Sequence, residues 1–145
     1  MTDLVQQMID RSLLRQTAEL YAAGADRRDK QLWRPLLAED CVIEGPGFAS
    51  EGRENCLLSL DALGQMFRGT VHRIHQQVVA IDGDRATGET HCTADHLLRD
   101  RDAILIWTIR YQDMWRRDAG MWRFTRRRLI VDWTETRSVT VGIGA

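Results

Sequence analysis

Four segments in the second half of the chain alternate between apolar and polar residues, and short turns separate them. The segments span residues 71–81, 86–98, 103–116 and 121–133. Asp82-Gly83-Asp84 and Asp118-Ala119-Gly120 are typical of hairpin turns, and residues 99–102 form a polar turn between the middle two segments. Strands joined by such short turns pair antiparallel. The sequence therefore predicts a meander of four long strands, which the rest of the chain must cover.

The first half of the chain has the spacing of helices. Apolar residues recur at helical intervals over residues 4–23, and Gly24 is placed to end this helix. Asp29 is a candidate N-cap for a short second helix, and residues 41–44 are typical of a short strand. A third helix begins at residues 51–54 and stops at Gly69.

Helices followed by a strand meander indicate an α+β fold. Three helices cannot cover both faces of such a sheet, so we expect a cone-shaped, curved antiparallel or mixed sheet. It would wrap around a pocket that the three N-terminal helices close. Residues 1–134 are predicted to form a single domain, and residues 135–145 an extended or disordered C-terminal tail.

Composition excludes several function classes. The formal net charge is −1, which does not favour a nucleic-acid partner. No apolar run approaches the roughly 20 residues that span a bilayer, and no signal-peptide pattern opens the chain, so we expect a cytoplasmic protein without a membrane partner. Cys41, Cys56 and Cys92 lack metal-binding spacing and are expected to be small buried residues.

Ionisable residues on the predicted strands are candidate catalytic groups. His72 begins the first long strand and is either a partly exposed histidine or a general base, since imidazole titrates near neutral pH. His96 shares a strand face with Cys92 and Ala94, whose small side chains leave room for a ligand. Only one of Asp95 and His96 points inward unless a bulge intervenes, and we favour His96.

Other residues keep two interpretations. Asp26 is either an N-cap or a carboxylate that orients a pocket histidine. Tyr21 is either a core aromatic or a phenol that binds a substrate carbonyl, and Tyr111 is an alternative phenol. Strand alternation turns at least one arginine of residues 126–128 inward, where it needs a partner such as Asp26, Asp95 or a substrate anion. We predict neither a metal nor a cofactor, because no motif for either is present.

Several segments in this order resemble the nuclear transport factor 2-like superfamily, in its SnoaL-like, scytalone dehydratase-like branch. They are residues 21–29, 33–40, 51–54, 72–86 and 118–133, so that the resemblance covers about residues 8–134. It implies a cone-shaped α+β barrel. The superfamily includes dehydratases, ketosteroid isomerases, polyketide cyclases, dioxygenase small subunits and binders, so function depends on the site.

The resemblance also implies roles for individual residues. His72 matches the catalytic histidine of scytalone and bile-acid 7α-dehydratases, and Asp26 matches the aspartate of their first helix. His96 matches the second histidine of scytalone dehydratase. The bile-acid enzyme has an acid in that place, which Asp95 would match. The spacing from Tyr21 to Asp26 also resembles that of the bile-acid enzyme. Register with the family turns three residues of the last strand into the cone: Arg127, Leu129 and Val131. Ala25 and Gly45 stand where scytalone dehydratase has tyrosines, which puts that substrate in doubt.

The predicted function is a cofactor-independent dehydratase or isomerase acting on a small hydrophobic cyclic or aromatic hydroxy-carbonyl compound. His72, oriented by Asp26, would remove a proton next to the carbonyl, and His96 would protonate the departing hydroxyl. Tyr21 or Tyr111 would bind the carbonyl oxygen. The alternative is a non-catalytic binder of a hydrophobic ligand, or the small subunit of a dioxygenase-like complex. Because the outer sheet face commonly packs on a second subunit in this superfamily, we expect a homo-oligomer, a dimer or trimer.

Overall fold

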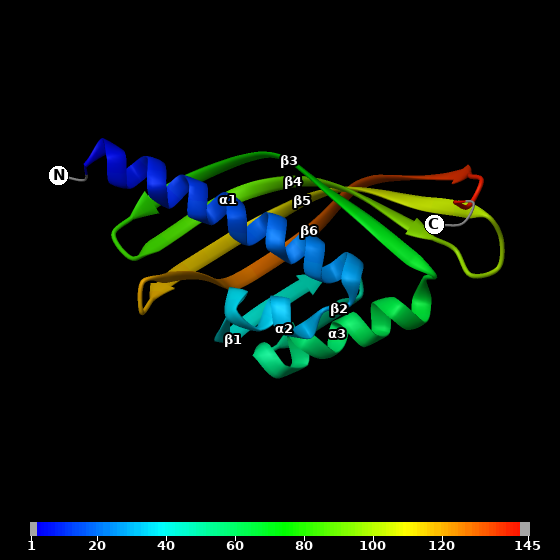
Figure 1. Ribbon diagram of the computed structural model, residues 1–145, viewed down its shortest axis with the longest axis horizontal. Helices are drawn as coiled ribbons and strands as arrows, with labels where there is room; N and C mark the ends of the chain where they lie inside the picture. Colours follow the sequence, from blue (N-terminus) through cyan, green and yellow to red (C-terminus); the bar gives the residue numbers. More distant parts are fainter. Residues whose placement is uncertain (1–2, 143–145) are drawn as a thin grey trace.

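The computed structural model describes residues 3–142, in which helices cover one face of a curved six-stranded sheet (Figure 1). The helical elements are α1 (Leu4–Arg27), α2 (Lys30–Trp33), the 3₁₀ turn η1 (Arg34–Leu36) and α3 (Arg53–Met66). The strands are β1 (Leu37–Gly45), β2 (Phe48–Glu51), β3 (Gly69–Asp82), β4 (Arg85–Leu97), β5 (Ala103–Asp118) and β6 (Met121–Ser138). The predicted α+β class with a curved mixed sheet is confirmed.

The sheet has the strand order β2-β1-β6-β5-β4-β3. Strands β3 to β6 form the predicted antiparallel meander, with the three turns in the expected places. β1 pairs parallel to β6 and antiparallel to β2, which makes the sheet mixed. The four residues of β2 follow the turn at Pro46 and Gly47 and were not predicted, because so short a strand has no clear alternation.

The first helix is longer than predicted. Gly24 does not end it, since α1 continues to Arg27. A Cβ atom at Gly24 would lie 2.3 Å from Cδ1 of Trp33, so this glycine lets the indole ring pack directly against the helix. The next helix is capped as predicted, because the Asp29 carboxylate accepts a hydrogen bond from the Leu32 amide at 3.0 Å. Asp26 lies in the additional turn of α1, which reaches the sheet. It is therefore not an N-cap.

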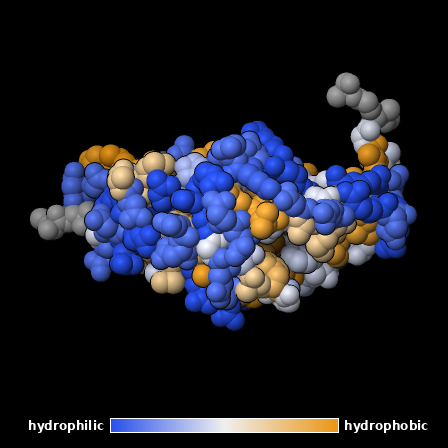
Figure 2. Space-filling view, turned by 90° about the horizontal axis from the view of Figure 1, so that it is seen from below, coloured by the Kyte–Doolittle hydropathy of each residue, from blue (hydrophilic) through white to orange (hydrophobic). Residues whose placement is uncertain are grey.

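The apolar stripe of α1 packs inward only from Leu14 onward. Leu4 and Met8, which precede it on the stripe, are 69% and 63% exposed. Leu14, Ala18 and Tyr21 are buried against the sheet. Apolar side chains also reach the surface elsewhere, and they gather near the middle of the face seen from below (Figure 2). These exposed groups lie outside the core.

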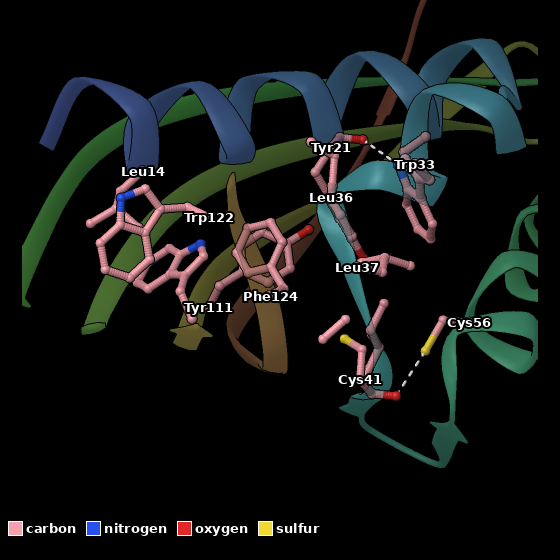
Figure 3. Packing of buried hydrophobic residues seen from close by; sticks show 14 of the residues in the cluster. Leu14, Tyr21, Trp33, Leu36, Leu37, Cys41, Cys56, Tyr111, Trp122 and Phe124 are labelled. Carbon is pink, nitrogen blue, oxygen red and sulfur yellow. Dashed lines mark hydrogen bonds between the residues drawn. The ribbon is translucent and has the colours of Figure 1, made fainter. Parts of the chain in front are cut away.

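The core lies between α1 and the concave face of the sheet (Figure 3). The Tyr21 ring stacks on Trp33 with centroids 4.2 Å apart, and the Trp33 indole Nε1 donates to the Tyr21 carbonyl at 2.8 Å. All three cysteines are free and buried, as predicted. The Cys56 thiol donates to the Cys41 carbonyl at 3.5 Å, so it joins α3 to β1. Within residues 3–142, no helix is long and apolar enough to cross a membrane.

Strand β3 changes face along its length. Its register with β4 shifts between Ile74 and Gln77. Unbroken two-residue alternation would place Val78 and Ala80 on the face of His72, but the bulge reverses the alternation. Val78 is 70% exposed, and Val79 is the buried residue.

Strand β6 extends beyond the predicted end of the domain. Residues 135–138 pair with β5. The first part of the predicted tail is therefore an extended strand of the sheet. The side chains of these residues are exposed. The part of the tail prediction that concerns residues 143–145 lies outside the described residues, as do residues 1–2 of the predicted domain.

Candidate active site

Asp26 and His72 form a hydrogen-bonded pair where the end of α1 meets the start of β3. The Asp26 Oδ1 and His72 Nδ1 atoms are 2.6 Å apart. The side chains are 24% and 8% exposed respectively, so solvent reaches the carboxylate more than the ring. The same carboxylate accepts the His72 backbone N–H at 2.9 Å and the Thr70 hydroxyl at 3.0 Å. Asp26 therefore holds both the ring and the backbone of His72.

The position of β3 at the edge of the sheet makes this contact possible. Edge strands present backbone groups that have no partner strand. Asp26 accepts one of these edge amides, and Arg15 and Arg11 of α1 donate to edge carbonyls at Ile74 and Val79. The polar side of α1 thus closes the sheet edge and brings Asp26 to His72.

The hydrogen bonds to Asp26 determine its charge and the tautomer of His72. Burial raises the pKa of Asp26, but the hydrogen bonds from His72 and Thr70 outweigh it, and the pKa lies below the ordinary 3.8. An ionised carboxylate can only accept, so Nδ1 of His72 carries the proton. In the neutral ring, Nε2 is then the acceptor, as a general base requires.

His96 lies inside, next to His72. It is buried on β4, its ring centroid is 6.0 Å from that of His72, and Phe67 and Trp107 flank it. Its Nδ1 is 3.0 Å from the Leu105 carbonyl oxygen, so Nδ1 carries a proton and donates it. The alternative, Asp95, points outward and pairs with Arg73 at 2.8 Å.

This geometry restricts the role that the sequence predicts for His96. Burial lowers its pKa from the ordinary 6.5, and the hydrogen bond to Leu105 opposes this shift only in part. His96 is then neutral at neutral pH, and its Nε2 accepts rather than donates. It can protonate a departing hydroxyl only after it has first been protonated itself.

The buried His96 should make stability depend on pH. Because its folded pKa is lowered, the unfolded chain binds the extra proton first, and stability falls as the pH drops below about 6.5. We expect His96→Gln to reduce this loss. The measurement is chemical denaturation between pH 7.5 and 5, with His75→Gln, at an exposed position, as the control. Equal slopes for wild type and His96→Gln would contradict a buried, neutral His96.

Arg127 lies fully buried at the centre of a second polar cluster. Its Nε and Nη2 atoms bind the two Asp113 oxygens at 2.7 and 3.1 Å, and Nη1 has no hydrogen-bond partner among the described residues. Thr90 donates to Asp113 at 2.8 Å. Burial lowers the pKa of Arg127, but Asp113 outweighs it and the net shift is upward. The predicted partners Asp26 and Asp95 are wrong, because both pair elsewhere.

Both tyrosines belong to the Arg127 cluster. The guanidinium carbon lies 4.3 Å from the Tyr21 ring centroid and 3.7 Å from that of Tyr111, which are cation–π distances. Burial raises the pKa of each phenol, so both are neutral donors. The ring contacts of Tyr21 are with this cluster and Trp33 rather than with the histidines.

The remaining predicted lining residues surround these two groups. Cys92 and Ala94 are buried on β4 between Thr90 and His96, and so join the Arg127 cluster to the histidines. Leu129 and Val131 are partly buried and pack against the core. Asp26 and His72 also line a groove of about 450 Å³ between α1 and β3, whose other residues include Arg15, Glu19, Arg27 and Ile74.

Several site residues were missed from sequence. Asp113 could have been found by alternation, because it shares the inward face of its strand with Tyr111 and Trp115. Thr70, and Arg28, which donates to the Thr70 hydroxyl at 2.9 Å, carry no such signal, since their roles depend on how α1 ends against β3. Within residues 3–142, no group of three or more potential ligands among His, Cys, Asp and Glu is placed to hold a metal ion.

Comparisons with known proteins place this geometry in a family. Residues 6–128 match the SnoaL-like domain. A scytalone dehydratase-like protein of Novosphingobium aromaticivorans is 22% identical, with a TM-score of 0.83 over 96% of this chain and 97% of that one. A comparison with curated proteins finds no match.

Two further solved structures have the same fold. The Kfla4162 protein of Kribbella flavida is 26% identical, with a TM-score of 0.82 over 89% of this chain and 95% of that one. The hexachlorocyclohexane dehydrochlorinase LinA-type3 of Novosphingobium barchaimii is 12% identical, with a TM-score of 0.88 over 99% and 100%.

Proposed function

Because the chain belongs to the SnoaL-like domain family, we propose that it is a lyase or isomerase that uses Asp26 and His72 for general acid–base chemistry. The supporting observation is the 2.6 Å contact between the Asp26 carboxylate and His72 Nδ1. This contact leaves Nε2 as the basic atom of a mostly buried ring. A hydrogen bond of this kind fixes the orientation of a catalytic imidazole and stabilises its charged form.

The reaction proposed is loss of water from a β-hydroxy-carbonyl compound. His72 Nε2 takes the proton from the carbon next to the carbonyl, and the C–H electron pair forms an enolate. The enolate then expels the β-hydroxyl by breaking the C–O bond. The departing oxygen takes the proton from the His72 imidazolium, which gives water and restores the neutral ring. In an isomerase the imidazolium would return its proton to another carbon.

Nearby groups support binding of an apolar, cyclic substrate. The His96 ring lies beside His72, and Phe67 and Trp107 flank His96 in turn. The neutral His96 accepts a hydrogen bond at Nε2, so it suits a substrate hydroxyl. Two of the proteins that share this fold have names that describe eliminations, a scytalone dehydratase-like protein and a dehydrochlorinase. We therefore favour elimination over isomerisation.

A screen of cyclic and aromatic hydroxy-carbonyl compounds tests this proposal. We expect mass spectrometry to detect loss of one water from at least one compound with wild-type protein. Asp26→Asn should not catalyse the reaction, because its amide cannot hold the imidazolium as a carboxylate does. Retention of a compound without conversion would favour the binding-protein alternative. Equal conversion by Asp26→Asn would contradict the proposed mechanism.

A further inference from the structure

Thr70 connects the Asp26–His72 pair to a permanent cation. Its hydroxyl donates to Asp26 Oδ1 at 3.0 Å and accepts from Arg28 Nη1 at 2.9 Å. Thr70 lies on β3 two residues before His72, so it faces the same side of the strand. Its side chain is therefore fixed by the same backbone that positions His72.

The direction of these hydrogen bonds follows from the chemistry of the groups. A guanidinium can only donate, so Arg28 occupies a lone pair of the Thr70 oxygen. The single hydroxyl proton is then free to point at Asp26, which is ionised and can only accept. Arg28 thus favours the rotamer in which Thr70 donates to the carboxylate.

The backbone at Arg28 places its side chain for this contact. Arg28 is the C-cap of α1 and has left-handed dihedral angles, φ 54° and ψ 40°, which are uncommon for a residue other than glycine. The reversal turns its side chain back across the helix end, where Nη1 also donates to the Ala25 carbonyl. Burial lowers the pKa of Arg28, which nevertheless remains a cation.

We propose that Thr70 and Arg28 are positioning residues, which hold the Asp26 carboxylate in the orientation that His72 needs as a base. This role rests on the proposed function for its effect on catalysis, whereas the hydrogen-bond geometry can be tested without a substrate. Neither residue is required to touch the reacting atoms. The order of contacts is Arg28 to Thr70, Thr70 to Asp26, and Asp26 to His72.

Thr70→Val tests the positioning role, because it removes the hydroxyl and keeps a β-branched side chain. NMR should show a broadened His72 Nδ1–H proton resonance and a higher pKa for the Asp26 carboxyl, since Thr70 lowers that pKa. Thr70→Ser should restore both signals. Once a substrate is known, kcat should fall about 10–100-fold at nearly constant KM. Mutation of a residue that orients a metal-bound histidine has an effect of this size.

Arg28→Gln, with Arg28→Lys as its matched control, tests the cation separately. We expect Arg28→Gln, which loses the charged donor to the Thr70 hydroxyl, to broaden the His72 Nδ1–H resonance, and Arg28→Lys to broaden it less. If Thr70→Val and Arg28→Gln fold and give wild-type NMR signals, the positioning role is overturned. If the NMR changes occur but no substrate is ever converted, the proposed function fails and the hydrogen-bond arrangement stands.

Discussion

Replacing His72 by alanine should lower kcat/KM by about 10²–10⁴-fold on any substrate that the protein converts. The alanine cannot accept the proton at the position where Asp26 now holds the imidazole, 2.6 Å from its carboxylate. The loss corresponds to about 2.7–5.5 kcal/mol of transition-state stabilisation. Steady-state kinetics with the first substrate from the screen provides the measurement.

His75→Ala is the matched control for this variant. His75 lies on the same strand, is exposed, and contacts Thr93 at 2.7 Å on the outer side of the sheet. Its removal should leave kcat/KM near the wild-type value. Full activity in His72→Ala would rule out the proposed base, and equal losses in both variants would indicate a general effect on β3.

Asp113→Ala should reduce the free energy of unfolding by about 3–5 kcal/mol. The variant leaves Arg127 buried at 0% exposure without the carboxylate that binds its Nε and Nη2 atoms. An unpaired charge in such a place is costly, and within residues 3–142 Nη1 already has no hydrogen-bond partner. Denaturant unfolding monitored by circular dichroism gives the value.

Asp132→Ala is a stringent control for Asp113→Ala. Asp132 also pairs with an arginine across β5 and β6, through two contacts of 2.8 Å to Arg110, but on the outer face. Its loss should change stability little, because solvent screens exposed pairs. The double variant Asp113→Leu/Arg127→Met should recover much of the loss. A small effect of Asp113→Ala alone would contradict the buried ion pair.

The strand meander could be predicted because its signals are local. The turns at Gly83 and Gly120, both with positive φ, bound strands whose alternation is clear in the sequence. Alternation also predicted that only one of Asp95 and His96 faces inward, and His96, the residue favoured, is the buried one. It failed on β3 after Ile74, because a bulge reverses the faces and leaves no compositional signal.

The site was less predictable, since its contacts join distant segments. The Asp26–His72 contact joins residues 46 apart in sequence; the residues alone left it as one of two interpretations of Asp26, and the family resemblance favoured it. In the sequence, Gly24 cannot be distinguished from a glycine that ends a helix. In the structure it lies within α1 and leaves room for the Trp33 ring. Arg127 was predicted to face inward, and alternation also places Asp113 inside, but their pairing depends on the register of β5 with β6, for which the sequence has no local signal.

Deuterium incorporation tests most directly whether Asp26 and His72 act as a base. A hydroxy-carbonyl substrate from the screen is incubated with protein in D₂O, and mass spectrometry follows label at the carbon next to the carbonyl. Wild type and His75→Ala should either exchange this hydrogen for deuterium or remove it as the product forms. His72→Ala and Asp26→Asn should do neither. Removal of the hydrogen at the wild-type rate by His72→Ala would contradict the assignment of His72 as the base.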